Sequence, residues 1–265
     1  MTSSEVWDEA TAERYDASSA EMFAPEVLDP MLDLLERLAN DGADTGADDG
    51  ANDRANDGAG RTGALEFAIG TGRVAIPLAA RGVPVSGIEL SEPMVRQLRR
   101  KVDESRIPVV IGDMATTVVP GEFSLVFLVW NGLSNLRTQG EQVACFRNAA
   151  HHLRPGGRFV IELWVPPLRR LPPGQQAVPM SMAEGHLVFD TYDLVSQGCT
   201  SHHYVTDPDG TTSYGSGSFR YAWPAECDLM ATLAGLEPEA RYADCAGAAF
   251  TSESESHVSI WRKPS

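Results

Sequence analysis

Residues 65–79 read LEFAIGTGRVAIPLA, and the apolar run VPVSGI follows at 83–88 before the acid Glu89. This pattern predicts a strand, a glycine turn, a helix and a second strand that ends on a carboxylate. Gly70 and Gly72 allow a sharp turn and a close approach of the backbone to a ligand, and the N–H groups at the helix start favour electron-rich atoms. Glu89 comes about 20 residues after the glycines, where a parallel strand would deliver it to a ribose diol. The stretch therefore predicts a site for a nucleoside-containing cofactor.

The identity of that cofactor depends on Glu66, the acid at the end of the first strand. Residues 70–75, GTGRVA, also fit the G-x-G-x-x-A fingerprint of dinucleotide-binding proteins. A carboxylate at Glu66 would repel a pyrophosphate, whereas it would attract a ligand that carries an ammonium and a sulfonium. The sequence thus favours S-adenosylmethionine (SAM), and it leaves an NAD(P)-dependent oxidoreductase as an alternative.

Two motifs carry a resemblance to a known family. The loop E-x-A-x-G-x-G at 66–72 resembles the E/D-x-G-x-G-x-G loop of class I SAM-dependent methyltransferases of the small-molecule type. Residues 153–163, LRPGGRFVIEL, are similar to the turn before the fifth strand of these enzymes, and dehydrogenases do not combine such a turn with such a loop. Ala68 departs from the family's glycine, and we expect its methyl group to require a negative φ.

The resemblance implies an α/β fold: a seven-stranded, mostly parallel, Rossmann-like sheet with an antiparallel last strand. A small antiparallel β cover is also expected, because polar and apolar residues alternate at 187–195, 199–207 and 211–222. The proline-rich segment 166–179 is interpreted as a connection. We expect five segments, namely N-terminal lid helices at 1–39, an acidic flexible linker at 40–63, the SAM-binding Rossmann-like core at 64–165, the antiparallel substrate-cover insertion at 166–222 and the C-terminal end of the core at 223–265.

The family's motifs assign several residues to the cofactor. Tyr15 lies in AERYD, which resembles an N-terminal A-x-x-Y-D lid motif, and Asp113 follows the third predicted strand, where an acid can accept the adenine amino hydrogens. The residues expected to bind SAM or its product S-adenosylhomocysteine (SAH) are Tyr15, Glu66, Ala68, Gly70, Gly72, Glu89, Leu90, Met94, Asp113, Met114 and Val129. Ligands of open α/β sheets lie beyond the carboxyl ends of strands, so we expect the substrate near Trp130, Asn131 and Trp164.

Composition limits the partners. The formal net charge is −16, and nucleic-acid substrates are disfavoured because proteins that bind them usually carry a basic patch. No run of 18 or more apolar residues and no N-terminal signal pattern occurs, which predicts a cytoplasmic protein without a membrane partner. The four cysteines form no C-x-x-C pair, so no metal site is expected. The expected partner is a small-molecule acceptor, and a homodimer is compatible with the sequence.

The resemblance implies an enzyme that moves the SAM methyl group to N or O of a small metabolite by in-line displacement. Candidate bases are His202 and His203 on the cover and His186 at its entrance, and ordinary surface or packing roles are the alternative for each. Adjacent strand residues point to opposite faces, so only one of His202 and His203 can face inward. A second alternative function is SAM binding without methyl transfer, with the pocket used for another reaction or as a scaffold.

Overall fold

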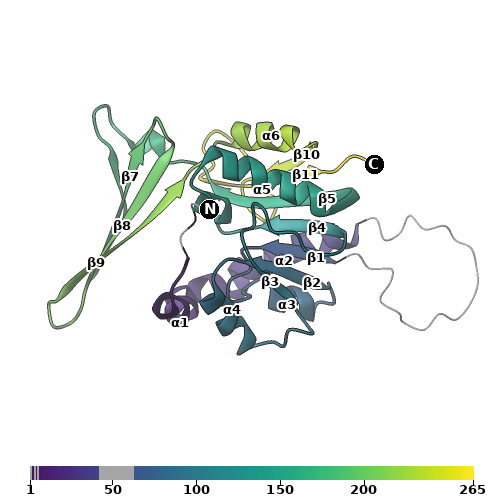
Figure 1. Ribbon diagram of the computed structural model, residues 1–265. Helices are drawn as coiled ribbons and strands as arrows, with labels where there is room; N and C mark the ends of the chain where they lie inside the picture. The colour runs from purple at the N-terminus through teal and green to yellow at the C-terminus, as the bar shows by residue number, and fades with distance from the viewer. Residues whose placement is uncertain (1, 3, 5, 42–62) are drawn as a thin grey trace, which may run out of the picture.

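The computed structural model describes residues 2, 4, 6–41 and 63–265, and its main element is a seven-stranded sheet (Figure 1). The strand order is β10-β11-β5-β4-β1-β2-β3. The pairs among β1 to β5 are parallel, whereas β11 runs antiparallel to both β5 and β10. The strands are β1 (Ala64–Phe67), β2 (Val85–Glu89), β3 (Val109–Ile111), β4 (Phe123–Leu128), β5 (Leu153–Trp164), β10 (Glu237–Tyr242) and β11 (Ser256–Arg262). The predicted Rossmann-like fold is confirmed, whereas most of the predicted linker at 40–63 lies outside the described residues.

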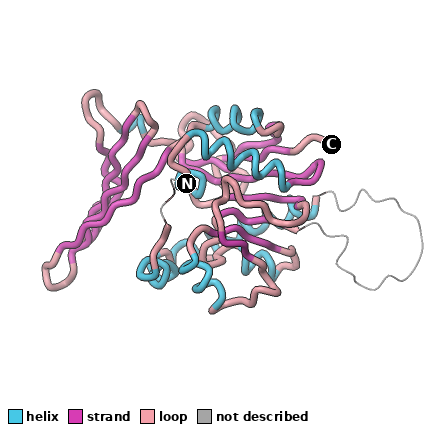
Figure 2. Tube along the Cα trace, in the orientation of Figure 1, coloured by secondary structure: helices cyan, strands magenta, loops and turns pink. Residues whose placement is uncertain are grey.

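Helices cover both faces of this sheet (Figures 1 and 2). Leucines of α2 and α3 pack on one face, and residues of α5 and α6 pack on the other. The buried apolar residues of α2 lie on one side of the helix, toward the sheet, and α5 begins with a capping box between Thr138 and Glu141. No helix in the described part of the chain is long and apolar enough to span a bilayer. The helices are α1 (Glu9–Ser18), α2 (Pro25–Asn40), α3 (Ala75–Ala80), α4 (Glu92–Arg99), α5 (Gln139–His152) and α6 (Pro224–Leu233).

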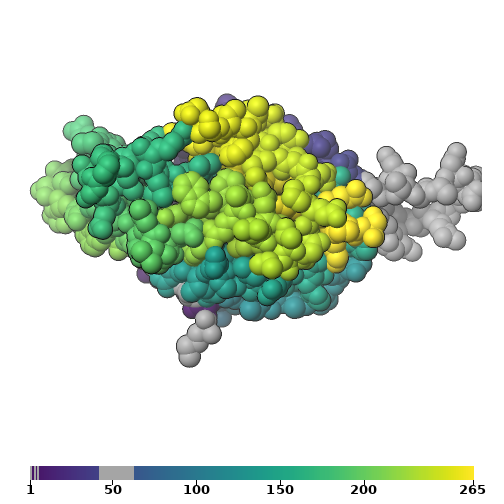
Figure 3. All heavy atoms as spheres, turned by 90° about the horizontal axis from the view of Figure 1, so that it is seen from above, coloured from purple at the N-terminus to yellow at the C-terminus, as the bar shows by residue number. Residues whose placement is uncertain are grey.

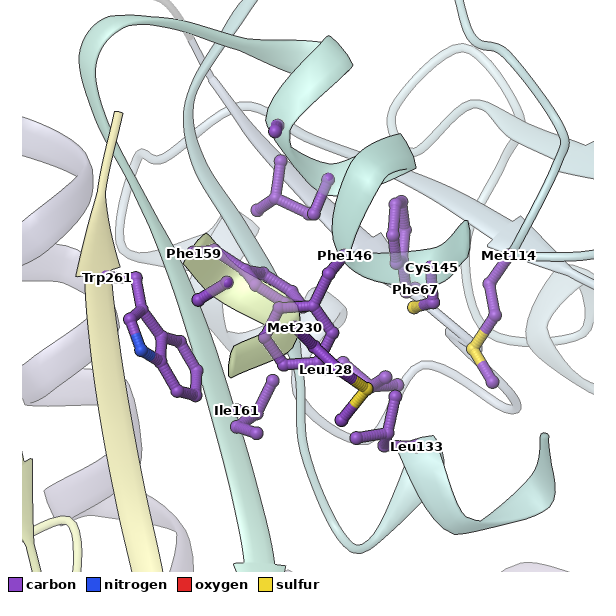
Figure 4. Packing of buried hydrophobic residues seen from close by; sticks show 14 of the residues in the cluster. Phe67, Met114, Leu128, Leu133, Cys145, Phe146, Phe159, Ile161, Met230 and Trp261 are labelled. Carbon is purple, nitrogen blue, oxygen red and sulfur yellow. The ribbon is translucent and has the colours of Figure 1, made fainter. Parts of the chain in front are cut away.

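An aromatic cluster fills the core between the sheet and α5 (Figure 4). The Phe146 ring of α5 meets Phe159 of β5 edge to face at 5.1 Å and Trp261 of β11 at 5.3 Å. All three side chains are fully buried. This packing fixes the strand that carries Glu162 and Trp164, and it thereby fixes one wall of the site described below.

A second, four-stranded antiparallel sheet projects from one end of the molecule (Figures 1 and 3). We call it the cover sheet; its order is β6-β7-β8-β9, with β6 (Ala177–Ala183), β7 (His186–Asp193), β8 (Gly198–Thr206) and β9 (Thr212–Arg220). The sequence predicted only three of these strands. It missed β6 because prolines mark residues 166–179 as a connection, yet β6 is an edge strand with a register shift between Pro179 and Ser181. An edge strand with a bulge tolerates a proline.

Candidate active site

The loop after β1 turns on residues with positive φ. The φ angles are 52° at Ala68, 58° at Gly70 and 84° at Gly72. The expected negative φ at Ala68 is therefore wrong. Hydrogen bonds from the backbone N–H groups of Ile69 and Gly70 to β2 fix the loop, so the turn falls on Ala68 whatever its side chain. At Gly72, a Cβ would come within 2.3 Å of Leu98 Cδ1, so this glycine allows the loop to pack on α4.

We expect the substitution Ala68→Gly to stabilise the protein by about 1 kcal/mol, because a left-handed conformation costs an L-residue about 1–2 kcal/mol and costs glycine almost nothing. The free energy of unfolding in urea measures this effect. The control is Ala80→Gly, which removes a methyl group from an exposed helical residue and should destabilise by about 1 kcal/mol. Equal losses in the two variants would contradict the strain at Ala68.

Glu89 ties β2 to the glycine loop. Its Oε2 accepts a hydrogen bond from the Gly70 N–H at 2.8 Å, and its Oε1 accepts one from the Ser91 N–H at 2.8 Å. Burial raises the pKa of Glu89, although the hydrogen bonds from Ser91 and Gly70 oppose the shift. The carboxylate lies at the end of β2 beside the parallel strand β1, as the motif predicts, and it lines the cavity described next.

A cavity of about 530 Å³ runs along the carboxyl ends of the parallel strands and under the cover sheet. It is large enough for a nucleoside cofactor and a second small molecule. The residues predicted for cofactor and substrate that line it are Tyr15, Glu66, Ala68, Gly70, Glu89, Leu90, Met94, Asp113, Met114, Val129, Trp130, Asn131 and Trp164. Gly72 does not line it, because Gly72 packs against α4 instead. Asp113 lines the cavity and also accepts a hydrogen bond from the Ala115 N–H at 2.8 Å.

Glu66 and Arg73 both line this cavity, and the Arg73 guanidinium influences the Glu66 carboxyl group. Glu66 is 4% exposed, and its Oε2 has no hydrogen-bond partner among the described residues. Burial raises the pKa of Glu66 well above its usual range, although the Arg73 guanidinium opposes the shift. Arg73 donates a hydrogen bond to the Met22 carbonyl at 3.3 Å and lies over the Trp130 ring at 5.4 Å. A buried acceptor beside a guanidinium can hold the ammonium and carboxylate groups of an amino acid.

The wall after β4 is built from two strained residues. Trp130 and Asn131 have φ angles of 53° and 56°, and hydrogen bonds to β5 hold both. Glu162 Oε2 accepts from the Trp130 N–H at 2.9 Å, and Asn131 Oδ1 accepts from the Trp164 N–H at 2.6 Å. The two indole rings meet edge to face at 6.5 Å. Strain of this kind accumulates at functional sites, where it fixes a side chain against a ligand.

The cover sheet carries the three candidate histidines, two on one face and one on the other. His203 lines the cavity, whereas His202 points to the opposite face, where it stacks on Phe189 at 4.8 Å. His186 Nε2 lies 3.2 Å from His203 Nδ1 and does not line the cavity itself. The strand alternation thus separates the adjacent histidines as expected, and the structure brings His203 and His186 together.

Helix α1 lines the end of the cavity next to the glycine loop. Tyr15 lines the cavity and packs edge to face on Trp7 at 5.4 Å. Thr71 donates a hydrogen bond to Asp16 at 2.6 Å, and Lys101 pairs with the same carboxylate. These contacts join the N-terminal helix to the glycine loop and to the end of α4.

Several polar groups in the cavity were not predicted from the sequence, among them Arg73, Asp190 and Ser201. Arg73 follows Gly72 directly, and a basic residue inside the loop is a usable signal for an anionic ligand group. Asp190 is a single acid among the inward residues Val188 and Tyr192 of β7. An acid on the apolar face of a strand also indicates a ligand-binding position, because burying a carboxylate costs free energy unless it has a partner.

Comparison with known proteins gives consistent results. A model of the methyltransferase domain matches residues 64–157. The chain is 34% identical to the CcbJ methyltransferase of Streptomyces caelestis, with 91% of this chain and 96% of that chain covered and a TM-score of 0.75. It is 28% identical over 198 residues to a cypemycin N-terminal methyltransferase of a Streptomyces species, covering 74% of this chain and 80% of that protein. It is also 34% identical over 100 residues, 38% of this chain and 39% of the relative, to the dTDP-4-amino-2,3,4,6-tetradeoxy-D-glucose N,N-dimethyltransferase of Saccharopolyspora spinosa.

Proposed function

Because the chain belongs to the class I SAM-dependent methyltransferases, we propose that it transfers the SAM methyl group to the nitrogen of a basic amine in a small molecule. Two relatives support nitrogen rather than oxygen as the acceptor: one methylates an N-terminus and the other an amino sugar, according to their names. A neutral amine is also the better nucleophile, since a hydroxyl needs a base to activate it. The observation that carries the proposal is the continuous cavity, which joins the glycine loop to the cover sheet.

The residues of the cavity fit SAM. Glu66 Oε2, buried and without a partner among the described residues, is an acceptor that suits the ammonium of an amino acid, and Arg73 suits the carboxylate. We propose that Glu89 binds the ribose and that Asp113 and Met114 bind the adenine. Tyr15, Ala68, Gly70, Leu90, Met94 and Val129 complete the proposed cofactor site.

The chain's own contribution to the reaction is alignment. When bound, SAM supplies a methyl group that its sulfonium already activates. Trp130, Asn131 and Trp164, fixed by their hydrogen bonds to one another and to Glu162, would orient the acceptor and exclude water. Orientation of two bound reactants can contribute up to about 7–11 kcal/mol to lowering the barrier.

The charge and the surface support further proposals about partners. With a net charge of −16, the protein is suited to a small-molecule substrate and not to nucleic acid. We also propose that it works in the cytoplasm. Leu229 and Leu233 are exposed one turn apart on α6, and we propose this helix as the contact of a homodimer. Light scattering of the purified protein and of a Leu229→Ser variant tests the oligomeric state.

Two measurements test the proposed function. Isothermal titration with SAM, SAH and NADH should show binding of SAM and SAH at micromolar concentration and no binding of NADH. Mass spectrometry should then show a mass gain of one methyl group on amines incubated with SAM and the protein, and none on the corresponding alcohols. Methylation of the alcohols alone would overturn the choice of nitrogen, and binding of NADH alone would overturn the choice of cofactor.

Binding of SAM is expected to release a proton from Glu66. The pKa of Glu66 is raised in the free protein, and an ammonium beside the carboxylate would lower it. The affinity for SAM should therefore rise with pH until the pH exceeds the pKa of Glu66 in the free protein. Titrations in two buffers with different ionisation enthalpies measure the released proton, and the Glu66→Gln variant should not release it. Equal heats in both buffers would contradict this prediction.

The same raised pKa has a consequence for stability. A carboxyl group with a raised pKa stabilises the folded state only at low pH, and this contribution is lost as the pH rises through the folded-state pKa. At neutral pH, Glu66→Gln should therefore raise the melting temperature of the free protein while it weakens SAM binding. A loss of both stability and binding would instead indicate a purely structural role for Glu66.

A further inference from the structure

Asp190 is a buried carboxylate at the acceptor end of the cavity. Its side chain lines the cavity from the middle of β7 and is 5% exposed. Its Oδ2 accepts a hydrogen bond from the Tyr192 hydroxyl at 3.3 Å, whereas its Oδ1 has no hydrogen-bond partner among the described residues. A buried carboxylate oxygen without a partner costs free energy in the protein alone. A ligand that donates a hydrogen bond or carries a positive charge would remove this cost.

The side chains around Asp190 make it the group most suited to recognise a charged ligand on the cover-sheet side of the cavity. Val188 and Tyr192 flank it on β7, and Phe219 of β9 and Tyr221, directly after β9, line the same cavity. Cys199 adjoins it, and burial raises the pKa of this thiol to about 12, with the Asp190 carboxylate adding to the shift. The thiol therefore stays protonated and neutral at physiological pH. A charged group of the acceptor that enters this wall meets Asp190 among apolar or neutral side chains.

A chain of polar groups begins directly opposite Asp190. The register of β7 and β8 pairs Asp190 with Ser201, and Figure 1 shows these strands side by side. Ser201 lines the cavity, and its hydroxyl lies 3.1 Å from His203 Nε2. His203 Nδ1 lies 3.2 Å from His186 Nε2, and His186 is partly exposed at the start of β7. The chain thus runs from the cavity to the outside of the cover sheet.

The charges around His203 favour its neutral form. Burial lowers the pKa of His203, the neighbours His186 and His202 add to the shift, and the Asp190 carboxylate opposes it. A neutral imidazole can accept a proton near neutral pH. Ser201 can pass a proton, since its hydroxyl can accept one from the acceptor while donating its own to His203.

We propose that the acceptor is a primary or secondary amine that arrives as an ammonium ion, that Asp190 binds this ammonium, and that Ser201, His203 and His186 take up the proton it must lose. The inference rests on the proposed function and adds the class of acceptor and the residues that receive it. An N–H bond of the ammonium breaks, and its proton passes through the Ser201 hydroxyl to His203. The freed electron pair forms the N–C bond to the methyl carbon, while the pair of the broken C–S bond stays on the sulfur of the leaving SAH.

The carboxylate of Asp190 favours nitrogen over oxygen as the nucleophile. The nitrogen becomes positively charged as it attacks a sulfonium, and a carboxylate in a site of low dielectric stabilises this charge. A hydroxyl is a weak nucleophile until it loses its proton, and the same carboxylate would oppose the negative charge of the resulting alkoxide. His186 acts through His203, and it is therefore a positioning residue.

The test uses three variants of the full chain: Asp190→Asn, His203→Gln and the control Glu184→Gln, which removes an exposed acid at the turn between β6 and β7. The probes are primary and secondary alkylamines and amino sugars, each paired with the alcohol that replaces its amine. Their binding to the SAH-loaded protein is measured by titration, and their methylation is measured by mass spectrometry. For each variant, the melting temperature and the affinity for SAH report whether the fold and the cofactor site are intact.

We expect amines to bind the SAH-loaded protein and their alcohols not to bind. Asp190→Asn should raise the KM for the amine by at least about tenfold with an unchanged affinity for SAH, since it removes a charged hydrogen bond. His203→Gln should lower kcat about 100-fold near neutral pH, and kcat should recover as the pH approaches the pKa of the amine. Glu184→Gln should match the native protein.

Three results would overturn the inference even where the protein binds SAM. They are the absence of amine binding to the SAH-loaded protein, a KM unchanged in Asp190→Asn, and a kcat with the native pH profile in His203→Gln. Failure of the native protein to bind SAM would instead overturn the proposed function.

Discussion

Replacing Glu89 with alanine is expected to weaken SAH binding about 100-fold, because hydrogen bonds to a charged group contribute about 1.5–3 kcal/mol each. Two of these bonds hold the Gly70 and Ser91 N–H groups in the free protein, and the proposed bond to the ribose adds to them. Titration of SAH measures the loss. The control is Glu92→Ala, which removes an exposed acid whose ion pair with Arg96 spans 3.8 Å and contributes little.

Glu89→Ala could weaken SAH binding either by loosening the glycine loop or by removing a contact with the ribose. An SAH analogue that lacks one ribose hydroxyl distinguishes these two causes. The native protein should bind 2′-deoxy-SAH less tightly than SAH, whereas Glu89→Ala should bind both about equally. This is the coupling expected when the carboxylate and the ribose hydroxyl contact each other. An undiminished preference for the hydroxyl in the variant would remove Glu89 from the ribose and leave it as the anchor of the glycine loop.

The sheet could be predicted, and the residues around the glycine loop could be placed in one cavity, because their signals are local. The glycines and acids of residues 65–89 fix a strand, a turn and a second strand within one short segment. Strand β4 is buried along its whole length. A parallel strand that is buried on both faces is almost continuously apolar, and this run could therefore be recognised in the sequence. Local rules of this kind also located the cavity, since ligands of such sheets lie at the carboxyl ends of the strands.

Backbone conformation set by distant partners could not be predicted. Ala68 has a positive φ because β2 holds the residues that follow it, and Trp130 and Asn131 have positive φ because Glu162 and Trp164 of β5 hold them. Strand β6 was missed for a related reason: Pro179 excludes a central strand, and only the finished sheet shows that this strand lies at an edge.

Along β8, the alternation of side chains between the two faces predicts only part of the site. It establishes that one of the two adjacent histidines faces inward, but it does not say which one, because the face of β8 depends on its register with β7. The same register sets Ser201 opposite Asp190. From the sequence, only the acid among the apolar inward residues of β7 indicates that this face meets a ligand.

Arg220, the last residue of β9, joins the cover sheet to the core, and its loss is the second large effect that we expect. Its guanidinium donates to Gln142 of α5 at 2.5 Å, to Gln197 in the turn after β7 at 2.9 Å and to Glu226 of α6 at 2.7 Å. Arg220→Met would leave the largely buried Glu226 without its positive partner. Breaking a buried ion pair in this way costs about 3–5 kcal/mol.

Urea denaturation should therefore show Arg220→Met to be less stable by about 3 kcal/mol, whereas Arg169→Met, which breaks an exposed pair with Glu253, should lose at most about 1 kcal/mol. The double variant Arg220→Met/Glu226→Gln should regain part of the loss, since it leaves no unpaired charge. A double variant as unstable as the sum of its single variants would contradict the pairing.

Acid should remove the contribution of this pair. Burial tends to raise the pKa of Glu226, but hydrogen bonds from Gln197, Arg220 and Gln139 outweigh it and hold the pKa below its usual value. A carboxylate with a lowered pKa stabilises the fold above its unfolded-state pKa, and this stabilisation is lost as the pH falls through the folded-state pKa. The difference in stability between the native protein and Arg220→Met should thus be large at neutral pH and shrink in acid.

Because the pair anchors the sheet that carries Asp190 and His203, Arg220→Met should also raise the KM for the amine while the affinity for SAH stays unchanged.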